Sequence, residues 1–573
     1  MSASREKQTR QTSQTENPRT AREAQQRKEE KRSSVLYKAV AVVFLLVVLA
    51  SVVWRTNLIP KMSTAATIDG QKYSAAEVSY YYNNAYQNFV NQYSYFVSYL
   101  GLDTNTPLKN QFVSETAASM LGIELPGGEE TESEDAAAPA EGEDVAAPAE
   151  GEDAAAPAEG ENADAPAEGE DAGAPAETNS GMTWHDYFVD QALENMSVIQ
   201  KTLEKAKSEN FAYPDSVQAQ QNASMDALKA TAAASNVSVS QYLGGVFGAG
   251  MTEKVYSEQL LRVLQYSAYV DAYNDSLSYS DDELESVYAA DPNSFDHVSY
   301  EYASFSGAAE TTTDEEGNTV EPTEEESAAA LEAARSSANA LMDELASGGS
   351  LEDLSKNYED ASYAVNDNAT YYAGSAVSEW LYDASRNEGD TSVVEDGTTV
   401  YVLEFHNRFR EEYNTIDIRH ILVPLGTATL TEEDEGYAEE QEQLKADAKA
   451  KAEELLSQWQ SGEATEESFA ALAMAESTDG SRYDGGLYSE VYQGQMVAEF
   501  NDWCFDASRK PGDTGVVETQ YGAHVMYFSG TNLPRWAAQA ASQLRNEDYA
   551  EWEESLTEGV SIAPNDPGMK FVG

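Results

Sequence analysis

A short segment near the end of the chain occurs twice. Residues 506–518 (DASRKPGDTGVVE) repeat residues 383–395 (DASRNEGDTSVVE), which lie 123 positions earlier in this 573-residue chain. The repetition predicts two copies of one domain. At the same offset some polar and apolar positions differ, namely Asp396 against Thr519, Tyr401 against His524, Val377 against Phe500 and Ala373 against Met496. Since the copies share a scaffold and differ at these positions, we expect a functional site in one of them.

The composition excludes several classes of function. The chain has 101 Asp and Glu residues against 35 Lys and Arg, a formal net charge of -66. A chain this acidic repels phosphate backbones, so we expect no nucleic-acid partner. The only cysteine, Cys504, excludes an internal disulfide, and no Cys/His cluster has zinc spacing. We therefore predict neither a metal nor another cofactor.

The basic residues are concentrated at the N-terminus. Residues 1–38 contain ten Lys or Arg, whereas residues 39–54 (AVAVVFLLVVLASVVW) contain no charge. Together with residues 35–37, this stretch is about as long as a bilayer core requires. The positive-inside rule then predicts a cytoplasmic tail at 1–38, a transmembrane helix at 39–54 and an extracytoplasmic remainder, anchored once in the cell membrane. A cleaved signal peptide is the alternative, although its basic region would be unusually long and no clear Ala-x-Ala site follows.

A helical module is predicted at 64–126 and 180–294. Ser74 with Glu77, and Ser280 with Glu283, have the spacing of a capping box. Tyrosines are dense here, and we expect most of them to fill helix interfaces. A minority exposed in a groove would suit unfolded chain segments, because the ring is apolar and the hydroxyl tolerates water.

The helical module is interrupted by an acidic repeat at 127–179. A nine-residue unit of Ala, Pro, Glu and Gly type occurs there five times in succession. The tract has no aromatic and almost no large apolar side chain, so it cannot bury enough surface to offset its ordering entropy. We predict a disordered loop, with a binding role as the alternative.

The two repeats are predicted to span residues 295–409 and 413–530. In the second, a strand at 416–423 (IDIRHILV) precedes a long helix, a short helix, and strands around 516–519 and 524–528. Strands separated by helices in this order indicate a compact α+β unit. A further helix is predicted at 533–558. The fold class is thus a multidomain α+β protein with one N-terminal transmembrane helix.

Five short motifs follow one another in the second repeat, namely RHILV at 419–423, STD at 477–479, GGL at 485–487, GQMVAEF at 494–500 and TQYGAH at 519–524. In their order, and closely in their spacing, they resemble the motifs of the parvulin-type peptidyl-prolyl isomerases. Together they cover nearly all of the repeat, so they form a strong signal where any one would be weak. The loop before GGL is one residue shorter than in the commonest family pattern.

The resemblance implies roles for seven residues of this chain. His420 and His524 would form the floor of the site, Asp479 would face the substrate amide, and Thr519 would join the histidine network. The pocket for the proline ring would consist of Leu487, Met496 and Phe500. His297 also lies 123 positions before His420, but Tyr302 fits the strand pattern better, and we assign His297 no role.

The order of the segments also resembles the extracytoplasmic foldase-chaperones of the PrsA and SurA type. This resemblance implies that the helical module acts as a chaperone and that the C-terminal helix packs back on it. The repeat at 295–409 has Tyr401 and Asp396 in place of His524 and Thr519, so we predict an inactive parvulin-like domain that serves as a spacer or a client-binding surface. The transmembrane helix in place of a lipid anchor, and the inserted acidic repeat, are departures from the pattern.

Prolyl isomerisation places few demands on the chemistry of a site. Rotation about a peptide bond costs roughly 18–20 kcal/mol, while cis and trans X-Pro differ by only about 0.5–1 kcal/mol. A catalyst needs no nucleophile. It needs an apolar pocket and polar groups that favour the twisted amide over the planar one. The predicted residues provide both, although two histidines and a threonine that satisfy each other in a core, and a turn-capping Asp479, are the structural alternatives.

These observations predict a membrane-anchored isomerase and folding chaperone. Its partners would be unfolded or partly folded exported polypeptides with X-Pro bonds. Glu432 to Glu435, which follow the first strand of the second repeat, argue against selection of phosphorylated substrates, because like charges repel. The alternatives are a holdase with little isomerase activity and, less favoured, a surface scaffold with neither activity.

Overall fold

The computed structural model describes residues 63–94, 96–123, 181–248, 250–313, 319–431 and 433–573. The predicted cytoplasmic tail, the transmembrane helix at 39–54 and the acidic repeat at 127–179 lie outside these residues. Among the helices within the described ranges, none is both long enough and apolar enough to cross a membrane. The chain divides into two compact units, which we call the helical unit and the repeat unit.

The helical unit comprises the described residues before 270 together with residues 554–573. The elements of this unit are β1 (Thr64–Ile68), β2 (Gln71–Ser74), α3 (Ala75–Gln92), η1 (Leu108–Asn110), α4 (Glu115–Leu121), α5 (Trp184–Ser208), α6 (Asp215–Ala234), α7 (Val239–Val246), most of α8 (Glu253–Ser276), β13 (Ile562–Pro564) and α17 (Asp566–Met569). Its three strands form a small antiparallel sheet in the order β13-β1-β2. Strand β13 pairs with β1, so residues almost 500 positions apart complete one sheet.

Aromatic side chains form the core of the helical unit. The Phe188 ring lies 5.3 Å from Phe89 and 6.0 Å from Trp184, and all three are buried. The capping box of Ser74 and Glu77 is present at the start of α3, as predicted. Most of the tyrosines described here are buried or partly buried at helix interfaces, which confirms the interpretation for those residues.

The repeat unit contains two four-stranded antiparallel sheets of the same topology. The first has the order β6-β3-β8-β7 and the second the order β10-β9-β12-β11. The elements up to the end of the first repeat are α9 (Asp281–Ala290), η2 (Pro292–Ser294), β3 (Asp296–Ser306), β4 (Thr312–Thr313), β5 (Thr319–Val320), α10 (Glu324–Ala346), α11 (Leu351–Ser355), β6 (Ala361–Ala369), α12 (Ala376–Leu381), β7 (Thr391–Asp396) and β8 (Thr399–Arg410).

The second repeat follows directly. Its elements are β9 (Asn414–Pro424), α13 (Tyr437–Ser461), α14 (Glu466–Glu476), η3 (Gly480–Asp484), β10 (Leu487–Val491), α15 (Ala498–Cys504), β11 (Thr514–Thr519) and β12 (Gly522–Pro534). Helices and antiparallel sheets within one chain confirm the multidomain α+β class. The edge strands β6 and β10 are absent from the sequence-based prediction.

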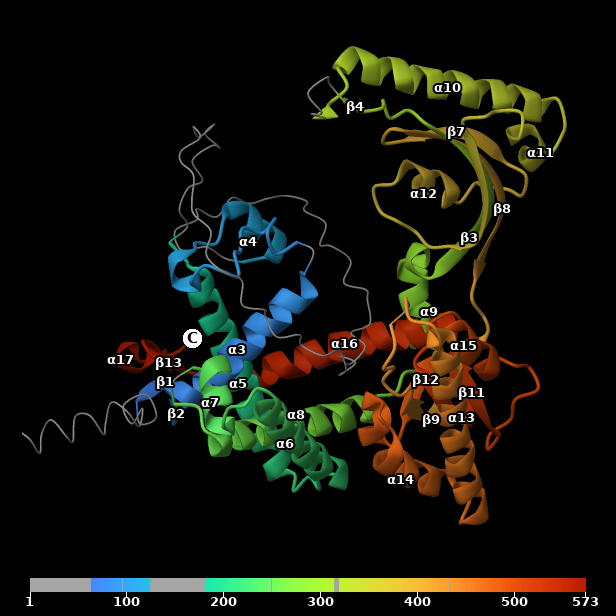
Figure 1. Cartoon of the computed structure of the whole chain (residues 1–573). Coiled ribbons are helices and arrows are strands. Elements are labelled where there is room, and N and C mark those ends of the chain that lie inside the picture. Colours follow the sequence, from blue (N-terminus) through green and yellow to red (C-terminus); the bar gives the residue numbers. More distant parts are fainter. Residues whose placement is uncertain (1–62, 95, 124–180, 249, 314–318, 432) are drawn as a thin grey trace, which may run out of the picture. The chain divides into compact units, whose positions relative to one another are not determined.

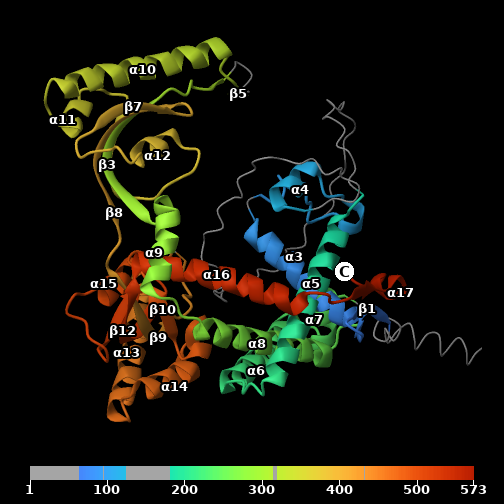
Figure 2. The same cartoon turned by 180° about the vertical axis from the view of Figure 1, so that it is seen from behind.

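Each sheet has helices on both faces. In the first repeat, α10 packs on one face and α12 on the other, as Figures 1 and 2 show. In the second repeat, α13 and α14 cover the face that includes Ile421 and Val525, while α15 covers the face that includes Ile418 and Met526. Because side chains alternate along a strand, His420 and His524 belong to the α15 face.

Helix α16 (Arg535–Thr557) follows β12. Its first turns are buried, and Trp536 and Ala540 pack against Leu284 of α9 and against Phe295. The Arg410 guanidinium lies 3.9 Å from the Trp536 ring centroid, a cation–π contact. These contacts hold the start of the helix against the segment that leads into the first repeat.

Candidate active site

Two strands bring the predicted histidines together. His420 lies on β9 and pairs with Met526, while His524 lies on the neighbouring strand β12 and pairs with Leu422. The two histidines are therefore diagonal neighbours on one face of the sheet. Their Nδ1 atoms are 3.1 Å apart, their ring centroids are 5.3 Å apart, and both side chains are buried.

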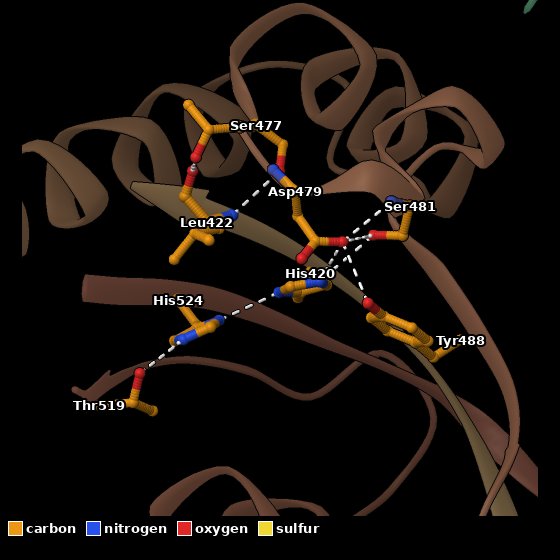
Figure 3. A network of polar contacts seen from close by, with 9 residues as sticks. His420, Leu422, Ser477, Asp479, Ser481, Tyr488, Thr519 and His524 are labelled. Atoms are coloured by element: carbon orange, nitrogen blue, oxygen red, sulfur yellow. Dashed lines mark hydrogen bonds and ion pairs between the residues drawn. The ribbon is translucent and has the colours of Figure 1, made fainter. Parts of the chain in front are cut away.

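Thr519 extends this network at the end of β11. Its Oγ1 lies 2.9 Å from His524 Nε2 and also accepts a hydrogen bond from the Tyr521 backbone N–H at 3.2 Å. While its oxygen accepts from Tyr521, the threonine hydroxyl can donate its own proton to His524 Nε2. The remaining proton of a neutral His524 is then on Nδ1, where it donates to His420 Nδ1. Figure 3 shows this chain of contacts.

Asp479 completes the network on the other side of His420. Its Oδ1 lies 3.2 Å from His420 Nε2, which carries the proton when His420 Nδ1 accepts. The same oxygen accepts from the Ser481 hydroxyl at 2.6 Å, the Ser481 backbone N–H at 2.9 Å and the Tyr488 hydroxyl at 3.1 Å. Every contact from Thr519 to Asp479 is thus satisfied with both imidazoles neutral.

Burial and hydrogen bonding set the charges of this network. Burial disfavours the imidazolium, and the neighbouring His420 adds to the effect, so the pKa of His524 falls to about 4. Burial also acts to raise the pKa of Asp479, but the hydrogen bonds from His420 and Ser481 outweigh it and hold that pKa well below the usual range. The site therefore presents an ionised Asp479 and a neutral His524 at neutral pH.

Asp479 is both a turn cap and part of the histidine network. It is the N-cap of η3, and its side chain accepts from the Ser481 backbone, as the structural alternative expects. Its contact with His420 places it in the site as well. Among the described residues its second oxygen, Oδ2, has no hydrogen-bond partner, and the side chain is 20% exposed. That oxygen is available to a ligand.

Two loop contacts hold Asp479 in place. Ser477 Oγ accepts hydrogen bonds from the backbone N–H groups of Leu422 and Asp479, at 3.0 and 3.2 Å. The loop also approaches β9 at Gly486, which has φ +76 and whose carbonyl accepts from the His420 N–H at 2.8 Å. A Cβ on this glycine would lie 2.2 Å from the His420 carbonyl oxygen, so no other residue fits without displacing β9.

Two of the three predicted pocket residues belong to the hydrophobic cluster on the α15 face, and one of them contacts both histidines. Phe500 on α15 is buried, and its ring meets those of His420 and His524 edge-on at 5.5 and 5.4 Å between centroids. Met496 is partly buried in the same cluster. Leu487 differs, because it pairs with Arg419 and so lies on the opposite face of the sheet from His420, outside this cluster.

Tyr488 occupies the position toward which Leu487 was expected to point. It pairs with Ile418 on the α15 face, and its ring centroid lies 5.2 Å from that of His420. Burial, followed by the Asp479 carboxylate, raises the pKa of Tyr488 to about 12, so its hydroxyl stays protonated and donates. Tyr488 and Ser481 were not predicted from the sequence. A serine two residues after an aspartate is a signal that could have indicated Ser481, whereas the short, bulged strand β10 gives no local signal for Tyr488.

Comparison with known proteins identifies the repeat. Residues 401–530 match the family model of the PPIC-type PPIase domain. The second repeat is a parvulin-type peptidyl-prolyl isomerase domain. A search among curated proteins gave no match.

Solved structures with likeness to the chain include two PrsA proteins. Peptidylprolyl isomerase PrsA from Bacillus anthracis is 22% identical, with 26% of this chain and 58% of that chain covered and a TM-score of 0.16. PrsA from Bacillus subtilis is 24% identical over 26% of this chain and 50% of that chain, with a TM-score of 0.18. The PPIase domain of TBPAR42 is 23% identical over 20% of this chain and 98% of that chain, with a TM-score of 0.15. The match spans about half of each PrsA chain.

The first repeat has tyrosines where the parvulin domain has histidines. Tyr302 pairs with Leu403, which is the counterpart of Met526 at the 123-residue offset, so Tyr302 corresponds to His420. Tyr401 corresponds to His524 at the same offset. The two tyrosine rings meet edge-on with centroids 5.7 Å apart. The register thus agrees with the strand pattern and not with the position of His297.

The counterpart of Thr519 also has a different partner. Asp396 accepts a hydrogen bond from the Ser375 hydroxyl at 2.5 Å, and Ser375 is the N-cap of α12. In the parvulin domain, the N-cap of α15 has no side-chain hydrogen bond, and Thr519 contacts His524. In the first repeat, Asp396 at the end of β7 therefore stabilises the start of α12. In the second, Thr519 at the end of β11 contacts His524.

Proposed function

We propose that the parvulin domain catalyses cis–trans isomerisation of X-Pro bonds in unfolded or partly folded exported polypeptides. The observation that carries this proposal is the continuous contact chain from Thr519 through His524 and His420 to Asp479, next to Phe500. The match of residues 401–530 to the PPIC-type domain supports it independently.

The apolar part of the site would grip the proline ring. Phe500 contacts both histidines, and Met496 packs in the same hydrophobic cluster as Phe500. Methionine is a compliant wall for a pocket. Leu487 is the first residue of the edge strand β10, so it would contact the proline ring only from the edge of the sheet. The apolar pocket would thus fix the proline side of the X-Pro bond, while the residue before the proline stays free to rotate about that bond.

The polar part would favour the twisted amide. In a planar amide, resonance places negative charge on the carbonyl oxygen, and this charge decreases as the bond rotates. The Asp479 carboxylate, next to that oxygen, would destabilise the planar form more than the twisted one. Such a difference lowers the rotation barrier without any covalent step. His420, His524 and Thr519 would hold Asp479 charged and in place, and would bind the backbone of the substrate.

The charge around the domain supports unmodified substrates. Glu433, Asp434 and Glu435 follow β9 in the loop that precedes α13, and no Lys or Arg interrupts them. A phosphate group would be repelled there. We therefore propose unphosphorylated X-Pro segments as the substrate class.

We propose that the first repeat is not an isomerase. The Tyr302 and Tyr401 pair replaces both imidazoles, and Asp396 is engaged in capping α12. A spacer or a client-binding surface is the role that remains for it.

We further propose that the helical unit binds unfolded clients as a chaperone and that the chain is anchored in the cell membrane with its N-terminus in the cytoplasm. Large apolar side chains are exposed within one segment of the helical unit, with Phe96 at 61%, Tyr99 at 68% and Met120 at 53%. Exposed apolar side chains close together in the chain suit the binding of unfolded segments. The basic residues 1–38 followed by the uncharged residues 39–54 support the anchor.

An isomerisation assay separates the enzyme from the holdase alternative. The full chain should accelerate isomerisation of an X-Pro peptide and the proline-limited refolding of a test protein. His524→Ala and Asp479→Ala should lose most of this acceleration while still suppressing aggregation of a proline-independent client. A wild-type chain that suppresses aggregation but gives no acceleration would leave the holdase as the function. Cleavage of an N-terminal tag by protease added outside intact cells would contradict the proposed topology.

A further inference from the structure

Two cavities lie next to each other in the helical unit. The first, of about 580 Å³, is bounded by the turn between β1 and β2, by α5 and by Arg262 of α8. The second, of about 450 Å³, includes Phe211 and Tyr213 of the segment that follows α5. Leu203 and Lys207 line both cavities. Together the cavities form one groove along α5, polar at one end and aromatic at the other.

Arg262 at the polar end lacks an ionic partner. Its Nη2 donates to the Tyr73 hydroxyl over 3.4 Å, and its guanidinium lies 5.9 Å from the centroid of the Tyr73 ring. Its Nε is buried and has no hydrogen-bond partner. Within the part of the chain that the structure describes, it forms no ion pair. A buried donor without an acceptor is destabilising, so such a group calls for an explanation.

The acidic groups at the rim of this cavity are already paired. Lys201 contacts both Asp69 and Glu204, and Glu204 also accepts from the Gln200 amide at 2.9 Å. Lys207, in the last turn of α5, is exposed and has no ion-pair partner among the described residues. The groove therefore offers two positive groups, Arg262 and Lys207, in a chain with 101 acidic and 35 basic residues.

The neutral groups of the cavity are held in fixed orientations. The Tyr73 hydroxyl donates to Gln200 Oε1 at 2.8 Å, and both side chains are more than nine-tenths buried. Burial raises the pKa of Tyr73, so the hydroxyl keeps its proton. The guanidinium of Arg262 thus contacts a tyrosine that is itself buried and hydrogen-bonded to Gln200. Such preorganisation lowers the cost of binding a ligand.

At the other end of the groove, aromatic rings form an apolar wall. The Phe211 ring meets the rings of Tyr213 and Tyr269 edge-on, each with 5.1 Å between centroids. Phe211 and Tyr213 are only partly buried, so they present surface to the cavity. An aromatic or large aliphatic side chain would fit against them.

We propose that this groove binds an extended polypeptide segment that places a carboxylate against Arg262 and Lys207 and a nearby aromatic or aliphatic side chain against Phe211 and Tyr213. Arginine binds carboxylates through paired, charge-assisted hydrogen bonds, and such bonds are about twice as strong as neutral ones. Either an Asp or Glu side chain or a free chain terminus supplies this group. The proposal rests on the proposed function only in that the ligand is a client polypeptide, and it does not involve the isomerase site.

Binding of short fluorescent peptides to the full chain tests the proposal. The first peptide has blocked termini, no proline, one Glu and a neighbouring Phe, and the second has Gln in place of Glu. The third has Gln and a free terminal carboxylate. We expect the Glu peptide to bind about tenfold more tightly than the Gln peptide, which corresponds to about 1.4 kcal/mol. If the third peptide regains the affinity and the Glu peptide does not, the carboxylate recognised is a chain terminus.

Variants assign the effect to the groove. Arg262→Gln should lower the affinity for the Glu peptide to that for the Gln peptide. Arg262→Lys should restore part of the difference between the two affinities. Lys207→Gln, at an exposed position that folding does not require, should weaken binding in the same direction. Lys229→Gln is the matched control, because Lys229 lies on α6 of the same unit and outside the groove.

Two results would overturn the proposal. One is equal affinity for all three peptides, and the other is an equal effect of Lys207→Gln and Lys229→Gln. Because the peptides contain no proline, loss of isomerase activity would not affect these measurements. A chain inactive in the isomerisation assay but selective among these peptides would contradict the proposed function alone.

Discussion

Arg545 of α16 forms a two-fold hydrogen bond with Glu490 of β10, at 3.2 Å to Oε1 and 2.6 Å to Oε2. Glu490 has φ +54, and the register of β10 against β9 shifts between Tyr488 and Val491. A left-handed conformation costs a residue such as glutamate about 1–3 kcal/mol and persists only where its surroundings enforce it. The Arg545–Glu490 ion pair is partly buried. It stabilises the bulge of β10 close to Tyr488, whose hydroxyl donates to Asp479.

Arg545→Gln should therefore weaken the isomerase site. We expect it to lower stability by about 1–3 kcal/mol and to reduce kcat/KM for an X-Pro peptide, because β10 would no longer hold Tyr488 in one position. Chemical denaturation and the peptide assay measure the two effects. Arg335→Gln is the control. It breaks the more exposed pair with Glu395 in the first repeat, and it should have little effect on stability and none on catalysis.

Tyr488→Phe isolates one hydrogen bond of the site. The substitution keeps the ring against His420 and removes the donor that reaches Asp479 Oδ1 at 3.1 Å. We expect kcat to fall by up to about tenfold with little change in KM, because the carboxylate is less well positioned while the apolar pocket is intact. Unchanged kcat would show that Ser481 and His420 suffice to hold Asp479.

The close approach at Gly486 predicts a strong dependence on residue size. Gly486→Ala would place a Cβ 2.2 Å from the His420 carbonyl oxygen in a backbone with φ +76. We expect a loss of more than about 2 kcal/mol in stability and a displaced His420, detectable by denaturation and by histidine NMR shifts. Gly480→Ala, six residues earlier in the same loop, meets nothing within 4 Å and should be nearly neutral. Equal effects would contradict the close packing of this loop on β9.

The buried His524 predicts a pH dependence of stability. Its pKa is about 4 in the folded chain against 6.5 for a free histidine, so between these values the unfolded chain binds a proton that the folded chain does not. Stability from this residue is thus fully present above about pH 6.5 and is lost as the pH falls toward 4. The total is on the order of 3 kcal/mol. Denaturation at several pH values should give a shallower slope for His524→Gln than for wild type over this range.

The sequence predicts the elements that have strong local signals. The capping boxes of Ser74 with Glu77 and of Ser280 with Glu283 are both present, because they depend on residues only three positions apart. The two central strands of the second repeat follow from alternating apolar residues, and His420 and His524 come together because both lie on these strands. Their pairing is thus as predictable as the strands themselves.

Edge strands and face assignments were harder to predict. Strand β6 has an exposed, polar sequence (ASYAVNDNA), which offers no buried alternation to detect. Strand β10 is short and bulged, so its register comes from long-range pairing with β9 and not from its own residues. The family resemblance assigned Leu487 to the proline-ring pocket, whereas the register places Tyr488 on the face that contacts His420. The convergence of Ser481 and Tyr488 on one oxygen of Asp479 likewise depends on the folded loop.

The most direct test compares the two repeats within one protein. In the full chain, His420 and His524 are both changed to alanine in one variant, and their counterparts Tyr302 and Tyr401 are both changed to alanine in another. We predict that the histidine variant loses about tenfold to a hundredfold in kcat/KM for prolyl isomerisation, while the tyrosine variant keeps the wild-type value. Equal activity of the two variants, or a greater loss in the tyrosine variant, would contradict the assignment of catalysis to the second repeat.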